Sequence, residues 1–458
     1  MNAWNYPGTC LMEELNMRLN RRSLLKLTSL TAASVCVPGF LPCAFGEDAP
    51  NNRPQFGAIG VGDRGREDTR LHKAKADLVA MADLDSNRLE AANRILCEGK
   101  AAAFSDYRKV LDRQDIDAVC IATPDHWHTK VCLDALAAGK HVFCEKPLTL
   151  TQKESQVLRA KAQECSKQTF AVGTQRRMEK NFARAVNMVR QGLLGKIHHV
   201  TVSISKSFNA TPAPPIDQRF KLLPVPEGFD WETWQGQAPV FPYRENRGHL
   251  RFRYWYEYAG GRVADWGAHY LDTTLWALDL DRPGVGIITV DPSDCLHPLP
   301  MKDGYPTEHD YYNTAYEFDM KATLSNGTLL DFETRRNDGI LFEGEKGRIF
   351  INCARITGKP IEEEWDKDCF GPDQMSALFK GKPVTDHITN FYSCIREGGL
   401  PTSDVYSHLQ TMAACHVFNI AARLGRCLTW DPVSETFPND AQANSFLERE
   451  QRKGYEVY

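Results

Sequence analysis

The sequence has no Cys-x-x-Cys pair, no long basic run beyond its N-terminal segment and no apolar run of comfortable membrane-spanning length. Its 14 cysteines follow no regular spacing, which argues against a disulfide framework, and Cys120 and Cys144 stand within apolar strand patterns. A formal net charge of -4 gives no electrostatic basis for binding nucleic acid or an anionic membrane surface. We therefore expect small molecules and further copies of the chain as partners.

The composition is that of a folded protein, with 42% hydrophobic and 25% charged residues over 458 positions. A chain of this length can bury two separate cores. The residue patterns divide it into a predicted export signal at residues 1–46, a nucleotide-binding domain at residues 47–174 and a second domain at residues 175–458.

The N-terminal segment has the features of an export signal. Arg21 and Arg22 stand directly before an apolar run at residues 24–40, and the small residues Ala44 and Gly46 follow at the spacing of a cleavage site. With SLLK directly after the arginine pair, the segment resembles a twin-arginine signal, which exports proteins already folded. The sequence therefore predicts a periplasmic or otherwise exported protein.

An N-terminal membrane anchor is the alternative interpretation of this segment. The apolar run is short for a span and is rich in Ser and Thr, so no stable membrane anchor is expected. Met17 stands directly before the signal, and either Met1 or Met17 is compatible with the start of the chain.

A glycine-rich turn follows the first predicted strand. GVGDRG at residues 60–65 comes after an apolar run at residues 56–59 and before a polar helical stretch, and a second apolar run ends at Asp83. The glycines allow the backbone to approach a pyrophosphate at a helix N-terminus, whose free N–H groups favour negative charge. A carboxylate at position 83 accepts from ribose hydroxyls and repels the 2'-phosphate of NADP, which favours NAD. Arg64 and Arg88 keep NADP possible.

Strand and helix patterns continue to alternate after this turn. DAVCIATP, KHVFCEKP and TFAVGTQRR read as strands, and DHWHTKVCLDALAAG and TQKESQVLRAKAQECSK read as the helices between them. This order predicts a doubly wound parallel sheet of the Rossmann type, which binds its ligand at the carboxyl ends of the strands. The predicted cofactor-binding residues are Gly60, Gly62, Asp63, Arg64, Gly65, Asp83, Thr123, Pro124, His128, Glu145, Lys146 and Gln175.

The tripeptide Glu145-Lys146-Pro147 stands where the buried strand HVFC ends. A partly desolvated lysine at the mouth of a nucleotide site is suited to exchanging a proton with a substrate hydroxyl. A lysine paired with its neighbour at a solvated strand end is an equally good interpretation of the tripeptide alone. Proline fixes the backbone at this point, in either the trans or the cis form.

The motifs GVGDRG, Asp83, TPDHWH and EKP, in this order and spacing, resemble the glucose-fructose oxidoreductase, inositol dehydrogenase and rhizopine-catabolism (Gfo/Idh/MocA) family. The resemblance covers nearly all of the chain from Gln55 onward. In that family the lysine of the EKP motif is catalytic, and the resemblance assigns this role to Lys146.

The second half of the chain has the pattern of antiparallel strands. NTAYEFDMKATLSNGTLLDFETRR predicts two strands joined at Asn326 and Gly327, and GILFEGEKGRIFINCAR predicts another pair that turns at residues 345–347. We therefore predict an α/β protein whose C-terminal domain is of the α+β type and holds a large, mostly antiparallel open sheet. The resemblance implies that this sheet serves self-association, so a homo-oligomer, a dimer or a tetramer, is expected.

Asp265 and His269 stand four residues apart and Asp272 follows three later, so on one helix all three would share a face. By itself this spacing is typical of a satisfied polar face. The family's facing helix begins with two glycines, followed by an acid and then by a histidine four residues later. The resemblance maps these onto Gly260, Gly261, Asp265 and His269.

The resemblance implies roles for these residues in a reaction on a hydroxyl group. Lys146 and His269 would bind and deprotonate the hydroxyl being oxidised, while Asp265 would orient the sugar and tune the histidine, which titrates near neutrality. Aromatic residues crowd the same segment, and core packing is the default interpretation for most of them, although sugar rings stack on such faces. The predicted catalytic residues are Lys146, His269 and Asp265, and the predicted substrate-binding residues are Arg176, Tyr243, Trp255, Asp265 and His269.

A metal site is an alternative use of the histidines. His126 and His128 form an HxH pair that a hydrolase can use, and Asp265 with His269 would complete a set of ligands. The family's TP helix start explains His128 without a metal, and a metal hydrolase has no need of the glycine turn. No metal is therefore predicted.

These features predict an exported NAD(P)-dependent oxidoreductase that transfers hydride from a secondary alcohol of a sugar, cyclitol or glycoside. Free NAD is scarce outside the cytoplasm, so the cofactor is expected to stay tightly bound and to be recycled in place. One alternative is a glycosidase in which bound NAD transiently oxidises a ring hydroxyl and eases elimination of the aglycone. A second alternative is a sugar-binding protein with a vestigial nucleotide fold.

Overall fold

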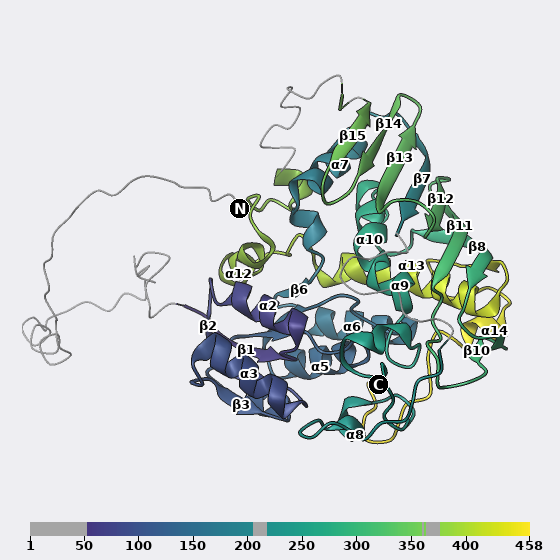
Figure 1. Cartoon of the computed structure of the whole chain (residues 1–458). Helices are drawn as coiled ribbons and strands as arrows, with labels where there is room; N and C mark the ends of the chain where they lie inside the picture. Colours follow the sequence, from purple (N-terminus) through teal and green to yellow (C-terminus); the bar gives the residue numbers. More distant parts are fainter. Residues whose placement is uncertain (1–52, 205–217, 360, 363–375) are drawn as a thin grey trace, which may run out of the picture. The chain divides into compact units, whose positions relative to one another are not determined.

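The computed structural model describes residues 53–204, 218–359, 361–362 and 376–458 (Figure 1). The predicted export signal, residues 1–46, lies outside the described residues. In the described ranges no helix combines the length and the apolar character that crossing a membrane requires.

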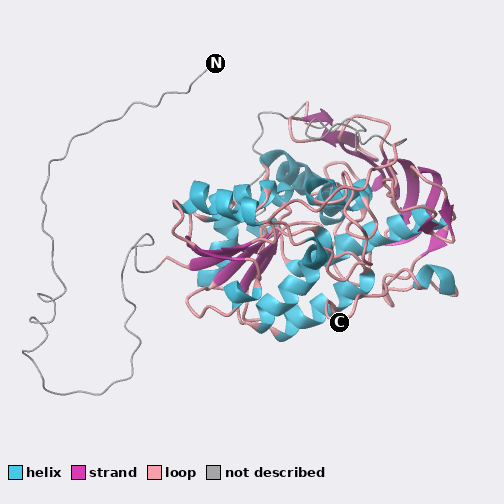
Figure 2. Cartoon of the chain, turned by 60° about the horizontal axis from the view of Figure 1, so that its bottom comes forward, coloured by secondary structure: helices cyan, strands magenta, loops and turns pink. Residues whose placement is uncertain are grey.

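The first sheet has six parallel strands in the order β3-β2-β1-β4-β5-β6. Because helices lie on both faces of this sheet (Figure 2), β4 is buried at every position and β5 at every position after His141, rather than at alternate residues. The strand order reverses between β1 and β4, which opens a crevice at their carboxyl ends. The predicted doubly wound sheet is confirmed. Its strands are β1 (Gln55–Ile59), β2 (Asp77–Ala82), β3 (Ala102–Phe104), β4 (Ala118–Ile121), β5 (His141–Cys144) and β6 (Phe170–Val172).

The helices of this domain begin and end where local signals place them. They are α2 (Asp63–His72), α3 (Ser86–Cys97), α4 (Arg108–Leu111), α5 (Asp125–Ala137) and α6 (Gln152–Glu164). The Asp85 side chain caps α3 by accepting from the N–H groups of Asn87 and Arg88. Pro124, in an extended conformation, stands before α5, and Gly139 follows its end with a φ of +75°.

The second sheet has eight strands in the order β15-β14-β13-β7-β12-β11-β8-β16. All neighbouring pairs are antiparallel except β7 and β12, which run parallel. The predicted hairpins at Asn326-Gly327 and at residues 345–347 are both present, and the prediction of a mostly antiparallel sheet is confirmed. The strands are β7 (Ile197–Ser203), β8 (Ile287–Leu296), β11 (Glu317–Leu324), β12 (Leu329–Glu333), β13 (Gly339–Gly344), β14 (Gly347–Ile351), β15 (Ile356–Lys359) and β16 (Leu428–Thr429). A separate ladder joins β9 (Met301–Lys302) and β10 (Tyr305–Pro306).

The remaining helices follow β6 along the chain, and of these η1 and α7 connect the first sheet to the second. The helices after β6 are η1 (Gln175–Met178), α7 (Lys180–Arg190), α8 (Trp231–Trp234), η2 (His249–Tyr254), α9 (Gly261–Asp265), α10 (Gly267–Ala277), α12 (His387–Glu397), α13 (Val405–Leu424) and α14 (Ala441–Asn444).

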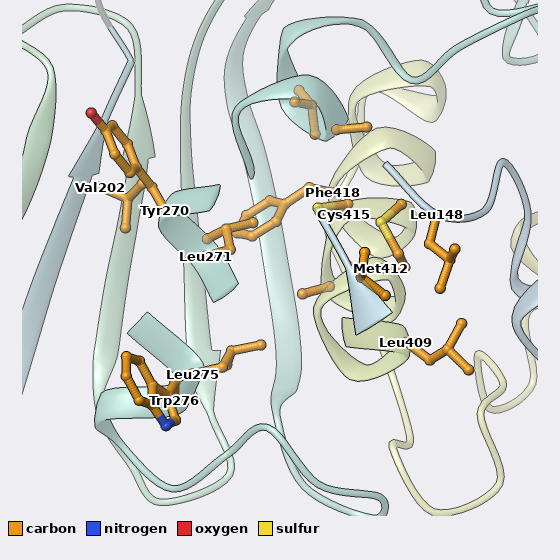
Figure 3. Close-up of a cluster of buried hydrophobic side chains, with 14 of the residues drawn as sticks. Leu148, Val202, Tyr270, Leu271, Leu275, Trp276, Leu409, Met412, Cys415 and Phe418 are labelled. Atoms are coloured by element: carbon orange, nitrogen blue, oxygen red, sulfur yellow. The ribbon is translucent and has the colours of Figure 1, made fainter. Parts of the chain in front are cut away.

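The long helix α13 is buried along most of its length and packs against both α6 and α10. Figure 3 shows Phe418 of α13 pointing toward Leu271 of α10, with Leu409 and Leu148 on the opposite side. One continuous apolar core therefore runs from the first sheet to the second, and it fixes the strand ends of one domain relative to the helices of the other.

The cysteines in the described ranges are free thiols. Cys120 and Cys144 are buried within β4 and β5, as their apolar surroundings in the sequence predicted.

Candidate active site

A cavity of about 570 Å³ opens at the carboxyl ends of the parallel strands, and residues of both domains line it. Its volume lies in the range of roughly 300–1,000 Å³ that is usual for small-molecule and cofactor sites. Most of the predicted site residues meet here. Those that line the cavity are Gly60, Gly62, Asp63, Arg64, Gly65, Asp83, Thr123, Pro124, His128, Glu145, Lys146, Gln175, Arg176, Asp265 and His269.

The glycine positions of the turn at residues 60–65 leave no room for side chains. A Cβ at Gly65 would lie 1.9 Å from the carbonyl oxygen of Gly60, and a Cβ at Gly62 would lie 2.8 Å from Nη1 of Arg88. Gly60 itself has a φ of +80°, which a side chain disfavours. Among the described residues no side-chain hydrogen bond caps the N-terminus of α2, so its first N–H groups are available to an anion. This cradle fits the pyrophosphate of a dinucleotide.

Asp83 lies at the end of β2 and holds the turn in place. Its Oδ2 accepts from the N–H of Val61 at 2.8 Å, and its Oδ1 accepts from the N–H of Asp85 at 2.9 Å. Burial raises the pKa of Asp83 above its usual range, although these two N–H donors oppose the rise. A carboxyl group at the β2 end is thus positioned to accept from a ribose.

The two arginines that kept NADP possible differ in their partners. Arg64 lies 2.8 Å from Glu145 and 2.7 Å from Asp68, so two carboxyl groups already contact its guanidinium. These contacts join the start of α2 to the end of β5. Arg88 is 3.6 Å from Asp85 and lies beside Gly62. Of the two, Arg88 stands nearer the end of the crevice where a 2'-phosphate would bind.

His128 joins the ends of two strands. Its Nδ1 lies 2.7 Å from the carbonyl oxygen of Pro147, and its Nε2 lies 2.8 Å from the carbonyl oxygen of Thr123. Pro147 follows a cis peptide bond from Lys146. His128 therefore supports the loop that carries the lysine.

His126, the other histidine of the HxH pair, also contacts the main chain. Its Nε2 lies 2.8 Å from the carbonyl oxygen of Trp234, and burial lowers its pKa to about 3. Within the described ranges, no three histidine, cysteine or acidic side chains form a group that could hold a metal ion. Each imidazole of the pair has a main-chain partner.

Lys146 of the first domain meets Asp265 of the second. The lysine Nζ donates to Oδ1 of Asp265 at 2.7 Å, and Arg253 lies 3.7 Å from the same carboxylate. Burial alone would raise the pKa of Asp265, but the charges of Arg253 and Lys146 hold it well below its usual range. Asp265 is therefore an ionised carboxylate between two cations.

The helix predicted to carry the acid and the histidine is interrupted, which corrects the expectation of one continuous helical face. α9 ends at Asp265 and α10 begins at Gly267. The N–H of His269 donates to the carbonyl oxygen of Trp266 at 3.0 Å rather than to that of Asp265. The carbonyl oxygen of Asp265 instead accepts from Lys146 Nζ at 3.1 Å.

Asp272 does not join this site, contrary to its place in the predicted face. Its carboxylate forms a fully buried two-point ion pair with Arg177, at 2.7 and 2.9 Å. Thr411 of α13 donates to the same carboxylate at 3.0 Å. Asp272 thus anchors α10 to η1 and α13 inside the core.

His269 provides a neutral imidazole at the cavity. Burial, together with the positive charges of Lys146 and Arg176, lowers the pKa of His269 well below its ordinary value. Its Nδ1 is buried and has no hydrogen-bond partner among the described residues. A buried imidazole nitrogen without a partner is suited to accept a proton or a hydrogen bond from a ligand.

Two of the predicted substrate-binding residues do not line the cavity. Trp255 is fully buried, its indole N–H donates to the carbonyl oxygen of Asn246 at 3.0 Å, and the guanidinium of Arg247 packs on its ring at 4.0 Å. Tyr243 packs edge-on against Trp231 with ring centroids 5.1 Å apart. The expectation that these rings face a sugar is therefore corrected. The aromatic rings at the cavity include Phe229, Trp234, Phe252 and Trp266.

Gln175 and Arg176 reach the cavity from η1, as predicted. The side-chain oxygen of Gln175 is buried without a hydrogen-bond partner among the described residues, which leaves it able to accept from a ligand. Arg176 forms an ion pair with Glu179.

Asp125 and Arg253 are titratable residues at the cavity to which the sequence analysis assigned no catalytic or binding role. Asp125 is the first residue of α5, and burial and the charge of Asp265 raise its pKa well above the usual range, against the opposing charges of Lys146 and Arg253. Its position at the end of β4, within the TPDHWH motif, was a usable signal. Arg253 offered none, because it lies in a segment of irregular pattern.

Comparison with known proteins places the chain in a family. Residues 55–174 match the description "Oxidoreductase family, NAD-binding Rossmann fold", and residues 178–457 match "Oxidoreductase family, C-terminal alpha/beta domain". The chain belongs to the Gfo/Idh/MocA oxidoreductase family. The sheet that carries the glycine turn is this family's NAD-binding domain.

Individual relatives match over shorter stretches. A "Glycosyl hydrolase family 109 protein" of Shewanella pealeana is 31% identical over 212 residues, which cover 40% of this chain and 45% of that protein. An "Inositol 2-dehydrogenase" of Salmonella paratyphi B is 29% identical over 144 residues, which cover 31% of this chain and 42% of that protein. The aligned stretches thus span less than half the length of these curated relatives.

Solved structures share the fold over most of the chain. The WlbA dehydrogenase from Bordetella pertussis, in complex with NADH and UDP-GlcNAcA, aligns with a TM-score of 0.58 at 20% identity. The alignment covers 85% of this chain and 100% of that one. At this identity the likeness establishes the fold.

Proposed function

We propose that the protein oxidises a secondary alcohol of a sugar, cyclitol or glycoside, with a tightly bound nicotinamide dinucleotide as the acceptor. One observation carries the proposal: Lys146 from the first domain and Asp265 and His269 from the second line the same cavity as the glycine turn. The membership of the oxidoreductase family supports it.

The proposed roles follow from the charges and hydrogen bonds of the site. Bound NAD would supply the acceptor for the hydride that leaves the alcohol carbon. Lys146 would donate to the substrate hydroxyl, and the neutral His269 would take the hydroxyl proton at its unpartnered Nδ1. Asp265 would hold the lysine in place and accept from a neighbouring sugar hydroxyl.

The cofactor would be held by residues around the cradle and the strand ends. The N–H groups of the glycine turn would bind the pyrophosphate, and Asp83 would accept from the adenosine ribose. Gln175 and Arg176 reach the cavity from η1, and the charge of Arg176 acts on His269. The carboxylate at position 83 favours NAD over NADP.

A redox-neutral glycosidase is the second candidate. The match to a glycosyl hydrolase family 109 protein favours it, because that relative belongs to a hydrolase class while sharing sequence with this chain. In this reaction the same alcohol oxidation would be transient and would precede loss of the aglycone. A vestigial sugar-binding protein is the less supported interpretation, because the charged groups of a working site are all present.

Export and self-association complete the proposal. Arg21 and Arg22 with the apolar run behind them support passage by the twin-arginine route to the periplasm. A cofactor carried out of the cytoplasm in this way must be recycled without leaving. We further propose a dimer or tetramer that associates through the open face of the eight-stranded sheet.

The test is to purify the full chain and identify its bound nucleotide by native mass spectrometry. The protein is then mixed with a panel of sugars, cyclitols and chromogenic glycosides. The expected result is bound NAD and a change in nicotinamide absorbance that accompanies a carbonyl product. Released aglycone without net carbonyl product would favour the glycosidase, and binding without turnover of any compound would overturn both enzymatic proposals.

A further inference from the structure

A segment of the second domain is hydrogen-bonded to the first domain beside the crevice. We name residues 227–254 the strap; it contains α8 and η2. The N–H of Ser86 donates to the carbonyl oxygen of Gly228 at 2.9 Å, and the N–H of Asp230 donates to the carbonyl oxygen of Leu84 at 3.0 Å. The side chain of Asn87 adds a hydrogen bond of 2.9 Å to the carbonyl oxygen of Glu227. These contacts form the first anchor, directly after β2.

The second anchor lies on the other side of the crevice, at the start of α5. The carbonyl oxygen of Trp234, at the end of α8, accepts from Nε1 of Trp127 at 2.9 Å and lies 2.8 Å from Nε2 of His126. α5 follows β4, whereas the first anchor follows β2. The strap therefore bridges the crevice between the two halves of the sheet.

The face that the strap turns toward the crevice lines the cavity. Phe229 and His249 lie with ring centroids 4.6 Å apart, and Nε2 of His249 is 3.4 Å from Oδ2 of Asp85. Both rings line the cavity together with Arg88 and Asp83. In doubly wound dinucleotide-binding folds the adenosine lies over the carboxyl end of β2, which is where these rings stand.

We propose that the strap is an intramolecular cover over the adenosine side of the dinucleotide site, so that bound NAD leaves only after the strap detaches from its anchors. The proposal rests on the proposed function, since it takes the cavity to hold a nicotinamide dinucleotide. It gives a physical means of retention that uses only this chain's own residues. The two aromatic rings supply apolar surface for the adenosine, and the anchors set the rate of release.

The contact at Gly228 provides the sharpest variant. A Cβ at this glycine would lie 2.3 Å from Oγ of Ser86, and its φ is +81°. Gly228→Ala should therefore weaken the first anchor, because either the side chains of Ser86 and Asn87 or the strap itself must shift to make room for the methyl group. Gly99→Ala is the matched control, because Gly99 has a φ of +78° and nothing within 4 Å of its Cβ position. The control imposes the same backbone strain without disturbing the anchor. Asn87→Ala is a milder second variant that removes only the bond to Glu227.

The experiment measures dissociation of NADH from the full chain. Protein loaded with NADH is mixed with excess NAD, and loss of the bound NADH fluorescence gives the rate of release. We expect release to be at least about tenfold faster in Gly228→Ala, with a smaller increase in Asn87→Ala and no change in Gly99→Ala, since such contacts act on the dissociation rate. If Gly228→Ala does not fold, the test compares the rate of NADH release from Asn87→Ala with the rate from wild type.

The outcomes separate this inference from the function on which it rests. Equal release rates in wild type, Asn87→Ala and any folded Gly228→Ala protein would overturn the cover while leaving the proposed function intact. A wild-type protein that binds neither NAD nor NADP would overturn the proposed function, and the cover with it. Faster release in the strap variants alone supports both.

Discussion

The Nζ atom of Lys146 lies 2.7 Å from Oδ1 of Asp265, although the two residues are 119 positions apart in the sequence. The pair joins the nucleotide-binding domain to the second domain inside the cavity, where both side chains are largely buried. A ligand hydroxyl that reaches Lys146 therefore enters between groups of opposite charge, each held by a different domain.

Replacing Lys146 by methionine tests the central role of this pair. We expect the rate of nicotinamide reduction by substrate to fall by about 10²- to 10⁴-fold, the usual contribution of a positioned acid or base. Bound NAD, assayed by mass spectrometry, should remain. Lys130→Met is the control, because Lys130 forms an ordinary pair with Asp134 along α5. Equal activity in the two variants would contradict the assignment.

The pH dependence of the reaction should reveal the environment of His269. Burial and nearby positive charges lower its pKa, so the imidazole stays neutral at and below the ordinary histidine value of about 6.5. We expect kcat/KM to hold as the pH falls through that value and to decline only at lower pH. A decline centred near the ordinary value would show that His269 is not the base. His269→Gln should lose about 100-fold or more at neutral pH.

Two matched substitutions distinguish the carboxyl groups at the site. The pKa of Asp125 is raised well above its usual range, so Asp125→Asn replaces one neutral group by another and should change kcat/KM by less than about tenfold. The pKa of Asp265 is lowered, so Asp265→Asn removes a charge and should cost more than about tenfold. A reversal of this order, measured on the same substrate, would refute a neutral Asp125 beside an ionised Asp265.

Asp83→Asn tests the preference for NAD over NADP while keeping an acceptor for the hydrogen bond that holds the glycine turn. The amide oxygen can still accept from the N–H of Val61, while the negative charge is lost. We expect the ratio of the NADP to the NAD dissociation constant to fall by about tenfold, equivalent to about 1.4 kcal/mol. Isothermal titration with both nucleotides on stripped protein measures the ratio, and an unchanged ratio would exclude this carboxyl group as the discriminating element.

Stability should fall in mild acid because buried histidines are neutral in the folded chain. Burial lowers the pKa of His416 to about 3 and that of His387 to about 4. Between the ordinary value of 6.5 and these values the unfolded chain binds protons that the folded chain does not, so the free energy of unfolding decreases as the pH falls. Each such histidine contributes a slope of about 1.4 kcal/mol per pH unit.

Denaturant unfolding at several pH values measures this slope. His416→Gln should make it shallower by roughly one proton's contribution, whatever its effect on stability at neutral pH. The same substitution at the exposed His198 is the control. An unchanged slope in His416→Gln would contradict the prediction.

The sequence was sufficient for features that depend on neighbouring residues. Runs of apolar residues and glycines at fixed spacing predicted the hairpin at Asn326-Gly327, the cradle at residues 60–65 and the strands β1, β2, β4, β5, β6 and β11 to β14. The strands β3, β8, β15 and β16 were not predicted. Lys146 and His269 were found because each stands in a short motif. Their common cavity is set by the shared core around α13, which no local pattern describes.

Features that depend on tertiary contacts were missed or misplaced. Trp255 looks like a sugar-stacking ring in the sequence, but it is buried against Arg247, which comes from a neighbouring turn. Gly267 was a sequence signal for the break between α9 and α10. A Cβ added at this glycine would lie 3.0 Å from Sγ of Cys415 on α13. A glycine in a helical pattern commonly marks such close packing. The contacts of the strap join segments more than 100 residues apart, so no local sequence pattern predicted them.

The interruption at Trp266 makes the lysine's location partly independent of the side chain at position 265. In a continuous helix the carbonyl oxygen of Asp265 would be occupied by the N–H of His269, whereas here it accepts from Lys146. Any residue at 265 offers that same oxygen. A substitution at 265 can therefore remove the charge and the side-chain hydrogen bond, while the ammonium group of Lys146 keeps its hydrogen bond to the main chain.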